Sequence, residues 1–282
     1  MITNIKQEAS HEQSIPPLIT VVTVVYNDCV NIEETMNSVI NQNYSNVEYI
    51  VIDGGSTDGT VEKIKKYEKH IPKWISEKDC GIYDAMNKGI KNASGKYMHF
   101  LNSGDKYYND DVLCDLKKLF LDDIDIIYGD NMISYDNCFN RIRKVCDLNG
   151  LWMGMKVSHQ SMLFKTELLK KRAFQLDYKL ASDYEYLCFA VYSGYKIVNS
   201  GSIISKISSS GQSDIKRDSV ANEFWRISKM YNKCRYVDLY YMIFIVYTRL
   251  LAKIKSVFPR KVVLNILKMK YLQFKSKELK VK

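Results

Sequence analysis

The sequence predicts an α/β fold, with a mostly parallel sheet flanked by helices and a helical, basic extension at the C-terminal end. Three observations predict it. Continuous apolar, β-branched runs alternate with amphipathic stretches over the first half of the 282 residues, which is typical of right-handed βαβ units. Acidic residues recur where the apolar runs end. Charge is also uneven, because residues 233–282 hold 13 Lys/Arg and two acidic residues, whereas the first 232 hold 28 basic and 30 acidic ones.

The apolar runs of the first half predict buried strands. The run LITVVTVVY (Leu18–Tyr26) is too continuous for a half-exposed strand, so it predicts a central parallel strand that is buried on both faces. VEYIVID (Val47–Asp53) has the same character. The strands expected in this half lie at residues 18–26, 47–53, 72–77, 96–102 and 123–134.

Helical spacing follows each of these strands. Ile32, Met36, Val39 and Ile40, for example, fall on one face of a helix. The helices expected in this half lie at residues 31–44, 60–71, 82–93 and 111–121. The second of them has three candidate capping residues, Ser56, Thr57 and Asp58. In the second half the alternation weakens, and we expect a strand at 157–165, a helix at 182–195 and one or two strands at 196–208.

The composition limits the class of protein. Hydrophobic residues make up 46% of the chain and charged residues 26%, as in an ordinary globular protein. Residues 1–16 lack the basic start and apolar core of a signal peptide, and we expect a polar arm there. The seven cysteines stand singly, without a CxxC pair, which favours reduced thiols in a cytosolic protein. The body of the chain has no positive bias toward nucleic acid, because the excess charge lies in the tail.

Three acidic residues fall at or just after predicted strand ends: Asp53, Asp79 and Asp105. The carboxyl ends of parallel strands share one edge of a sheet, so the three carboxylates are expected to converge on one crevice. Each has an alternative reading as an ordinary turn residue beside glycine. Repetition at successive strands favours convergence.

Glycine-rich phosphate loops are absent from the sequence. The first strand is followed by YNDCVN, which contains no glycine, and neither GxGxxG nor GxxxxGK[ST] occurs. A diphosphate ligand would therefore need a metal ion or basic side chains to balance its charge. Asp105 is a candidate ligand for Mg²⁺ or Mn²⁺, since these ions prefer carboxylate oxygens.

Several stretches, in this order and spacing, together resemble glycosyltransferase family 2, the inverting enzymes of the GT-A fold. They are Leu18–Asp28, VIDGGSTDGT, SEKDCGIYDAMNKGIKNASGKYMHFLNSGD and SHQ…LASDYE. The likeness extends from Pro17 to Ile227 and is greatest to bacterial members that build capsule, O-antigen or exopolysaccharide. It implies a GT-A domain at residues 17–215, after an arm at 1–16. From its charge and the spacing of its apolar residues, the region at 216–282 is expected to be helical, basic and membrane-associating.

The resemblance implies a nucleotide-sugar site along the strand ends. Asp53 matches the acidic residue that bonds the nucleobase, and the glycines after it allow close backbone approach. The first strand and its turn are expected to contact the base and ribose. The other donor-binding positions that the resemblance implies are Val24, Tyr26, Asn27, Asp79, Gly81, Asn87 and Asn102.

LNSGD (Leu101–Asp105) resembles the metal motif of the family, written DxD or DxDD. Asn102 stands at its first acidic position, Gly104 at the middle one and Asp105 at the last. Asn102 offers an amide oxygen without a charge, so we expect Asp105 to hold Mg²⁺ or Mn²⁺ with modest affinity. The alternative is that this stretch is an ordinary β-turn.

The family places its catalytic base in an acidic motif at the start of a helix, which LASDYEYL matches. The resemblance implies Asp183 as the base, with Glu185 in reserve. It implies that His159 lies on a strand facing the acceptor, where it bonds the acceptor or the leaving phosphate. Asp183 has an alternative as a helix cap, and His159 as a buried, hydrogen-bonded histidine. Ser210–Ser213 matches a mobile family loop and is a candidate lid.

The tail contains LYYMIFIVYT (residues 239–248), an uncharged run that is shorter than the ~20 residues a bilayer span needs. The apolar residues of this region recur at helical spacing, at Ile243, Tyr247, Leu250, Ile254 and Val257. Pro259 is expected to end this helix before a second begins. A cationic amphipathic helix suits an anionic membrane surface. The alternative is a helix that packs this stripe on the catalytic domain.

These features predict an enzyme that transfers a sugar, with inversion, from a nucleotide sugar to a lipid-linked saccharide at the inner face of the cytoplasmic membrane. A UDP-sugar is the donor by resemblance. The alternative is a catalytically inactive binding or assembly subunit of the same fold, which the uncharged Asn102 and Gly104 favour. Nucleic-acid binding through the tail is a third hypothesis, weakened by the absence of stacking motifs or a recognised helix module in the acidic body.

Overall fold

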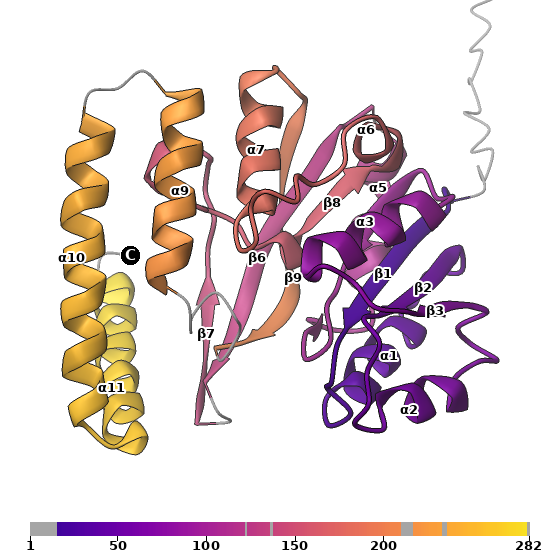
Figure 1. Ribbon diagram of the computed structural model, residues 1–282, viewed down its shortest axis with the longest axis horizontal. Coiled ribbons are helices and arrows are strands. Elements are labelled where there is room, and N and C mark those ends of the chain that lie inside the picture. Colours follow the sequence, from indigo (N-terminus) through magenta and orange to yellow (C-terminus); the bar gives the residue numbers. More distant parts are fainter. Residues whose placement is uncertain (1–15, 122, 136–137, 210–216, 233–235, 281–282) are drawn as a thin grey trace, which may run out of the picture.

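The computed structural model describes residues 16–121, 123–135, 138–209, 217–232 and 236–280. In this part of the chain one mixed sheet runs through the molecule, with helices on both of its faces (Figure 1). The strand order is β3-β2-β1-β4-β8-β6-β9-β5, and β7 pairs with β6. The predicted α/β class is therefore confirmed.

The first four strands are parallel and form the half of the sheet that the sequence predicted most directly. β1 pairs with β2 on one side and with β4 on the other, so Ile19 lies opposite both Val47 and Tyr97. Every residue of β1 is buried, as expected of a strand covered on both faces. The bounds are β1 (Ile19–Val25), β2 (Val47–Asp53), β3 (Lys73–Ser76) and β4 (Tyr97–Phe100).

Alternate residues of these strands pack into two separate cores. Val22 and Val24 face the core that includes α3 (Ile82–Asn92). Val21 and Val25 face the opposite core, which includes α1 (Ile32–Ile40) and α2 (Thr60–Lys66). The expected cap of α2 is wrong, because Gly59 holds the cap position and no side chain caps the helix. Asp58 lies just before it, and its Oδ1 accepts the N–H of Thr60 (3.1 Å).

The rest of the sheet is largely antiparallel and less regular than the sequence suggested. The strand predicted at 157–165 is a 3₁₀ turn, η2 (His159–Ser161), followed by β8 (Met162–Lys165). The helix predicted at 111–121 divides into α4 (Val112–Asp115) and α5 (Lys117–Leu121). The remaining elements before the tail are β5 (Lys106–Tyr107), β6 (Ile126–Tyr135), β7 (Phe139–Arg143), η1 (Leu151–Met153), α6 (Thr166–Lys171), α7 (Ser182–Tyr192) and β9 (Ile197–Ser208).

Three helices form the tail: α9 (Arg217–Tyr231), α10 (Tyr236–Val257) and α11 (Arg260–Lys280). The break around Pro259 is where the sequence predicted it. α9 lies alongside α7, and α10 packs on the outer side of α9 (Figure 1). No helix in the part of the chain that the structure describes is both long and apolar enough to cross a membrane.

The apolar stripe predicted on α10 does not pack on the domain. The inward face of α10 is a different one, and its buried residues are Val237, Tyr241, Ile245 and Thr248. The predicted stripe is exposed to solvent along its whole length, at Ile243, Tyr247, Leu250, Ile254 and Val257. The packing alternative for this stripe is therefore wrong.

Candidate active site

The strand order reverses between β1 and β4, and we call the edge at their carboxyl ends, where the predicted crevice would lie, the crevice edge. From β1 the chain moves outward to β2 and β3, then returns to pair β4 with the other side of β1. The order in which the chain adds strands to the sheet therefore reverses between β1 and β4, and such a switch point is where open α/β sheets bind ligands. Asp53, Asp79 and Asp105 all follow parallel strands, so they lie on this edge.

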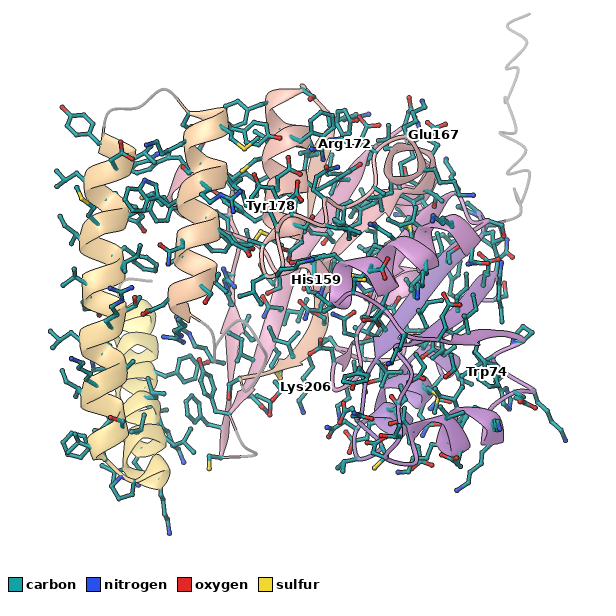
Figure 2. All side chains as sticks on the ribbon, in the orientation of Figure 1. Trp74, His159, Glu167, Arg172, Tyr178 and Lys206 are labelled. Carbon is teal, nitrogen blue, oxygen red and sulfur yellow. The ribbon has the colours of Figure 1, made fainter. Side chains whose placement is uncertain are left out.

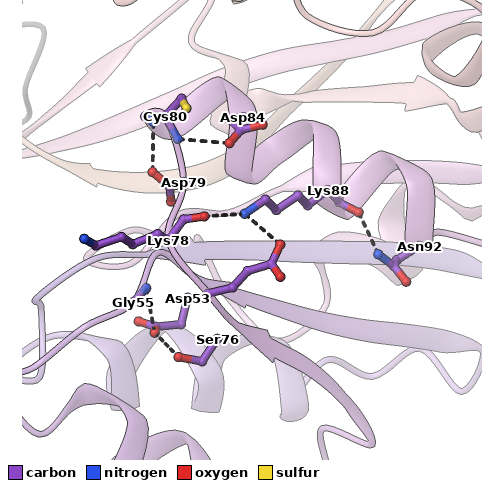
Figure 3. Close-up of polar contacts among 11 residues, drawn as sticks. Asp53, Gly55, Ser76, Lys78, Asp79, Cys80, Asp84, Lys88 and Asn92 are labelled. Atoms are coloured by element: carbon purple, nitrogen blue, oxygen red, sulfur yellow. Dashed lines mark hydrogen bonds and ion pairs between the residues drawn. The ribbon is translucent and has the colours of Figure 1, made fainter.

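Asp53 ends β2 and is fully buried. Its Oδ2 atom accepts hydrogen bonds from the N–H of Gly55 (3.1 Å) and from Ser76 Oγ (2.6 Å) (Figure 3). The same oxygen accepts the N–H of Ser56 (3.0 Å). Its Oδ1 atom is buried and has no hydrogen-bond partner within the described residues. An unsatisfied buried acceptor is destabilising, so Oδ1 is suited to accept an N–H from a ligand.

Glycine is required in the turn that follows Asp53. A Cβ atom on Gly54 would stand 2.4 Å from Asp79 Oδ2, and Gly55 has a φ of +84°. Asp79 Oδ1 in turn accepts the N–H of Gly81 (2.8 Å), which starts α3 (Figure 3). The turn after β2 therefore packs directly against the carboxylate of Asp79 in the loop after β3.

The turn after β1 is joined to the same loop. Asn27 adopts a φ of +48°, unusual for a residue with a side chain. Its N–H donates to Ser56 Oγ (2.7 Å), and its Oδ1 accepts the N–H of Thr57 (2.9 Å). Tyr26 is 64% exposed at the lip, whereas Val24 is buried in the core. The side chain of Tyr26 is therefore open to solvent, whereas the apolar side chain of Val24 packs in the core and the carbonyl of Val24 accepts the N–H of Ser103 (3.0 Å).

The NSGD segment (residues 102–105) is a turn that is hydrogen-bonded to residues of the loop after β1 and of α1. Gly104 has a φ of +88°, and its N–H donates to Thr35 Oγ1 (3.0 Å). Ser103 Oγ donates to Asp28 Oδ2 (2.7 Å), which adds a carboxylate to the crevice that the sequence did not single out. This segment can therefore be both a turn and a ligand-binding motif, because its backbone places Asn102 and Asp105 at the end of the strand.

Asp105 and Asn102 supply oxygen atoms suited to a hard cation. Burial raises the pKa of Asp105 to about 6, against a hydrogen bond from Gln160 Nε2 to Asp105 Oδ2 (2.8 Å). Asn102 Oδ1 is buried and unpartnered among the described residues. No group of three or more His, Cys, Asp and Glu side chains in the described ranges could hold a metal ion. The two oxygens fit Mg²⁺ or Mn²⁺ that keeps waters and binds substrate phosphates.

His99 supports this side of the crevice from behind. It is fully buried, with Nε2 3.0 Å from the carbonyl oxygen of Gln160 and Nδ1 2.9 Å from the hydroxyl of Tyr107. A carbonyl can only accept, so Nε2–H donates to Gln160 and the Tyr107 hydroxyl donates to Nδ1. Burial lowers the pKa of His99 to about 4. His99 is therefore a neutral support for the residue that bonds Asp105.

His159 connects the NSGD turn to helix α7. It lies on η2, not on a strand as predicted, at the centre of the molecule (Figure 2). Its Nε2 is 2.9 Å from Asn102 Nδ2, and its Nδ1 is 2.9 Å from Asp183 Oδ2. With the amide nitrogen of Asn102 as donor, the neutral imidazole carries its proton on Nδ1 and donates it to Asp183.

Asp183 is placed in the first turn of α7 and is 9% exposed. Its Oδ1 accepts hydrogen bonds from the hydroxyl of Tyr83 (2.8 Å) and the N–H of Tyr184 (2.8 Å). Ala181 is the N-cap and no side chain caps the helix, so the cap alternative for Asp183 is wrong. Burial acts to raise the pKa of Asp183, but the hydrogen bonds from His159 and Tyr83 outweigh it and the pKa is lowered.

Glu185 does not share this position. It is 1% exposed and faces away from His159, with its Oε1 bonded to Arg172 (2.6 Å) and to the hydroxyl of Tyr231 (2.5 Å). Its Oε2 is buried without a partner in the described part of the chain. The expectation that Glu185 is a reserve base is therefore wrong, and its contacts are those of a structural ion pair.

Two other expected positions stand apart from the crevice contacts. The side-chain amide of Asn87 makes two hydrogen bonds with the backbone of Phe174. Asn87 Nδ2 donates to the Phe174 carbonyl (2.9 Å), and Asn87 Oδ1 accepts the Phe174 N–H (3.0 Å). The described hydrogen bonds of Asn87 therefore tie α3 to the chain after α6. The candidate lid, Ser210–Ser213, lies outside the described residues.

The sequence did not identify the residues that hold the candidate catalytic groups. Tyr83 and Gln160 were visible inside the resembling stretches, but no pattern gave them a role. Their functions depend on contacts across the fold: Tyr83 reaches Asp183 from 100 residues away and Gln160 reaches Asp105 from 55. Such long-range pairs leave no periodic signal in a single sequence.

Comparison with known sequences gives one family and several relatives. The sequence model of the family described as Glycosyl transferase family 2 matches residues 20–182. A Mycobacterium tuberculosis protein named uncharacterized glycosyltransferase is 33% identical over 179 residues, which cover 61% of this chain and 68% of that protein. TuaG of Bacillus subtilis, named putative teichuronic acid biosynthesis glycosyltransferase, is 39% identical over 97 residues, covering 33% of this chain and 38% of TuaG.

Comparison with solved structures confirms the GT-A fold. The mannosyltransferase PcManGT from Pyrobaculum calidifontis, solved with GDP-Man and Mn²⁺, has a TM-score of 0.65 and 18% identity, with 92% of this chain and 81% of that chain covered. Staphylococcus aureus TarS 1–349, solved with UDP-GlcNAc, has a TM-score of 0.61 and 20% identity. There the match covers 76% of this chain and 65% of the TarS chain. These likenesses concern the fold.

Proposed function

Because this chain belongs to glycosyl transferase family 2 and is a glycosyltransferase, we propose that it transfers one sugar, with inversion, from a UDP-sugar to a hydroxyl of a lipid-linked saccharide. The product would be a bacterial surface polysaccharide such as capsule, O-antigen or exopolysaccharide. The observation that carries the proposal is the connected path from Asp183 through His159 to Asn102. It joins the candidate base to the turn that would bind the donor diphosphate.

The donor side of the proposal rests on Asp53 and its surroundings. The unpartnered Oδ1 of Asp53 is a buried acceptor, which suits the N3–H of uracil. Tyr26 and Asn27 border the same turn and would contact the base and ribose. The TarS structure that shares this fold was solved with UDP-GlcNAc, and TuaG is named for teichuronic acid biosynthesis. The first favours a UDP-sugar as donor, and the second favours a product such as teichuronic acid.

In the proposed reaction the acceptor oxygen attacks the anomeric carbon from the face opposite the phosphate. The new C–O bond forms as the bond from carbon to the diphosphate oxygen breaks, and the electron pair leaves with the nucleoside diphosphate. Asp183 takes the hydroxyl proton, a role that contributes typically ~10²–10⁴-fold. His159 and Tyr83 hold the two oxygens of Asp183 toward the acceptor side.

The leaving diphosphate requires positive charge. Asp105 and Asn102 would hold Mg²⁺ or Mn²⁺, with Gln160 orienting the carboxylate of Asp105. When bound, such an ion would neutralise charge that develops on the leaving oxygen. The PcManGT structure was solved with Mn²⁺, which favours a divalent ion here.

We place the enzyme at the inner face of the cytoplasmic membrane, held by its tail. Besides the exposed stripe of α10, α11 also has exposed apolar residues, which are Val262, Ile266, Met269 and Leu272. Residues 233–282 carry 13 basic and two acidic residues. An exposed apolar face with this positive charge suits an anionic bilayer surface, where a lipid-linked acceptor would be found.

The test of the proposed reaction is donor binding and turnover by the purified full chain. A panel of UDP-, GDP- and TDP-sugars is screened by thermal shift in Mg²⁺ or Mn²⁺, because a bound ligand stabilises the folded state. Release of the nucleoside diphosphate then measures turnover. We expect a UDP-sugar to bind and to be hydrolysed slowly. Absence of binding by every nucleotide sugar at millimolar concentration refutes the proposal, and binding without any turnover favours the inactive subunit.

A further inference from the structure

Helix α9 is hydrogen-bonded to the loop that leads into α7. The family model matches residues 20–182 and therefore does not include α9. Glu223 accepts the N–H of Lys179 at Oε1 (3.0 Å) and the N–H of Leu180 at Oε2 (2.9 Å). Both carboxylate oxygens are thus used on consecutive backbone amides. Asp183, the candidate base, stands three residues after Leu180.

Other side chains of α9 contact the same region. The ring of Phe224 lies 4.5 Å from that of Tyr184, measured between centroids, and the guanidinium of Arg226 lies 5.3 Å from the ring of Tyr178. The hydroxyl of Tyr178 is 3.0 Å from Met230 Sδ. Figure 1 shows α9 and α7 side by side, and Figure 2 labels Tyr178 beside α9. One face of α9 therefore serves as the support for the start of α7.

Asp183 needs this support because its partners belong to other elements. Tyr83 comes from α3 and His159 from η2, and each hydrogen bond tolerates only a few tenths of an ångström of displacement. A displacement of about 1 Å in a catalytic group can lower the rate by about a hundredfold. The position of the loop before α7 determines how far the first turn of α7 is shifted along the helix axis and rotated about it, and therefore where the carboxylate of Asp183 lies.

We infer that Glu223 is a positioning residue for Asp183. It holds the backbone of residues 179–180 so that the carboxylate of Asp183 meets the Nδ1–H of His159 and the hydroxyl of Tyr83. The described hydrogen bonds of Glu223 go to the backbone of the loop and not to His159 or Asp183, so its proposed action on Asp183 is indirect. The inference rests on the proposed function in one respect: the base that Glu223 positions is the base of sugar transfer.

The variant that tests this is Glu223→Gln. The amide keeps the shape of the carboxylate but leaves one acceptor oxygen, so one of the two backbone N–H groups loses its partner. Glu223→Asp retains both oxygens on a shorter arm and is the conservative variant for rescue. Asp218→Asn is the matched control, because Asp218 is a carboxylate on the same helix that pairs with Arg249 of α10 (2.8 Å) and not with the loop.

Two measurements need no substrate. Amide hydrogen exchange of the full chain, read by NMR, reports the N–H groups of Lys179 and Leu180, and the imidazole nitrogen shifts of His159 report its hydrogen bond to Asp183. In Glu223→Gln we expect faster exchange of these amides by about tenfold, which corresponds to 1.4 kcal/mol, and an altered His159 Nδ1 signal. Asp218→Asn is expected to change neither, and Glu223→Asp to fall between Glu223→Gln and wild type.

The third measurement is the release of UDP from UDP-glucose, UDP-galactose and UDP-N-acetylglucosamine. We expect Glu223→Gln to lower kcat by about tenfold or more while the Kd for the donor stays within a factor of two. A wild-type kcat or an unchanged His159 signal in Glu223→Gln would overturn the inference. If wild type binds none of these donors, the proposed donor class fails, whereas the exchange and His159 measurements still decide whether Glu223 positions Asp183.

Discussion

His159 Nδ1 lies 2.9 Å from Asp183 Oδ2, and the opposite edge of the same imidazole faces Asn102. The ring thus spans the distance between the two halves of the candidate active site. Asn102 occupies a position where the family motif has a carboxylate, and its amide nitrogen fits an unprotonated Nε2. The uncharged residue that favoured an inactive subunit therefore has a structural role beside the candidate base.

Asp183→Asn is expected to remove turnover and spare the donor site. The amide cannot accept the acceptor proton, so kcat should fall by about 10²–10⁴-fold. The Kd for the donor, measured by calorimetry, should stay within a factor of two, because Asp53 and Asp105 are unchanged. Retention of more than a tenth of the wild-type rate would exclude Asp183 as the base.

Asn102→Asp is expected to tighten Mn²⁺ binding. A second carboxylate beside Asp105 restores an acidic position of the metal motif, and hard divalent ions bind more tightly as ligand charge increases. We expect the Kd for Mn²⁺, measured by electron paramagnetic resonance with UDP present, to fall by about tenfold. Asn140→Asp, which adds the same charge at an exposed position of β7, is the control and should not change it. Unchanged or weaker Mn²⁺ binding in Asn102→Asp would show that residue 102 is not a ligand.

The lowered pKa of His99 should affect how the free energy of unfolding depends on pH. Its folded pKa of about 4 lies below the unfolded 6.5, so the unfolded state binds more protons between these values. Stability is therefore lost as pH falls through this window, by about 3 kcal/mol. Asp105 acts oppositely: its folded pKa is about 6 against 3.8 unfolded, so acidification from 6 to 4 stabilises by a similar amount. The two effects nearly cancel in wild type.

His99→Gln should remove the contribution of His99 to the pH dependence of stability and leave that of Asp105. Glutamine can keep one donor and one acceptor toward Gln160 and Tyr107 but does not titrate. The variant should gain stability relative to wild type on going from pH 6 to pH 4, by about 3 kcal/mol. Urea unfolding in EDTA at several pH values measures the difference. Parallel stability curves for the two proteins would contradict a neutral, buried His99.

Arg172→Met should destabilise the fold by breaking a buried pair. Glu185 would keep its buried carboxylate with Tyr231 as its remaining partner, and removing one member of such a pair costs about 3 kcal/mol or more. The double variant with Glu185→Leu should be more stable than Arg172→Met alone, because no buried charge is left. Urea unfolding of both variants checks this order. Equal stability would mean that Glu185 finds other partners.

Acidic substitutions on α10 should release the protein from membranes. Ile243 and Val246 are 62% and 66% exposed, so Ile243→Asp with Val246→Asp should leave the fold intact. Loss of two apolar contacts with lipid should weaken binding to phosphatidylglycerol vesicles by about a hundredfold. Ile142→Asp, at an exposed position of β7, is the control. Vesicle binding that survives the double change would assign the stripe to another partner.

Much of the donor half could be predicted from the sequence, because its signals are local. The uninterrupted apolar runs at 18–26 and 47–53 predicted β1 and β2, and parallel strands place Asp53 and Asp105 on one edge. The acceptor half could not be predicted in the same detail. The sequence predicts a strand at His159 because the apolar residues after it form one, and nothing local indicates that the chain turns before Met162. It offers Glu185 as a reserve base because sequence spacing does not reveal its ion pair with Arg172.

The contact of Phe224 with Tyr184 and the grip of Glu223 on its loop also determine how this protein can be recombined with its relatives. A chimera joined at residue 182, where the family match stops, would take the loop before α7 from one parent and α9 from the other. The contact surface between that loop, α7 and α9 (the seam) would then be formed by residues of two different parents. Exchanging acceptor preference between relatives therefore requires moving Tyr178 to Tyr231 as a single block. A crossover placed before Tyr178 or after Tyr231 keeps this seam within one parent.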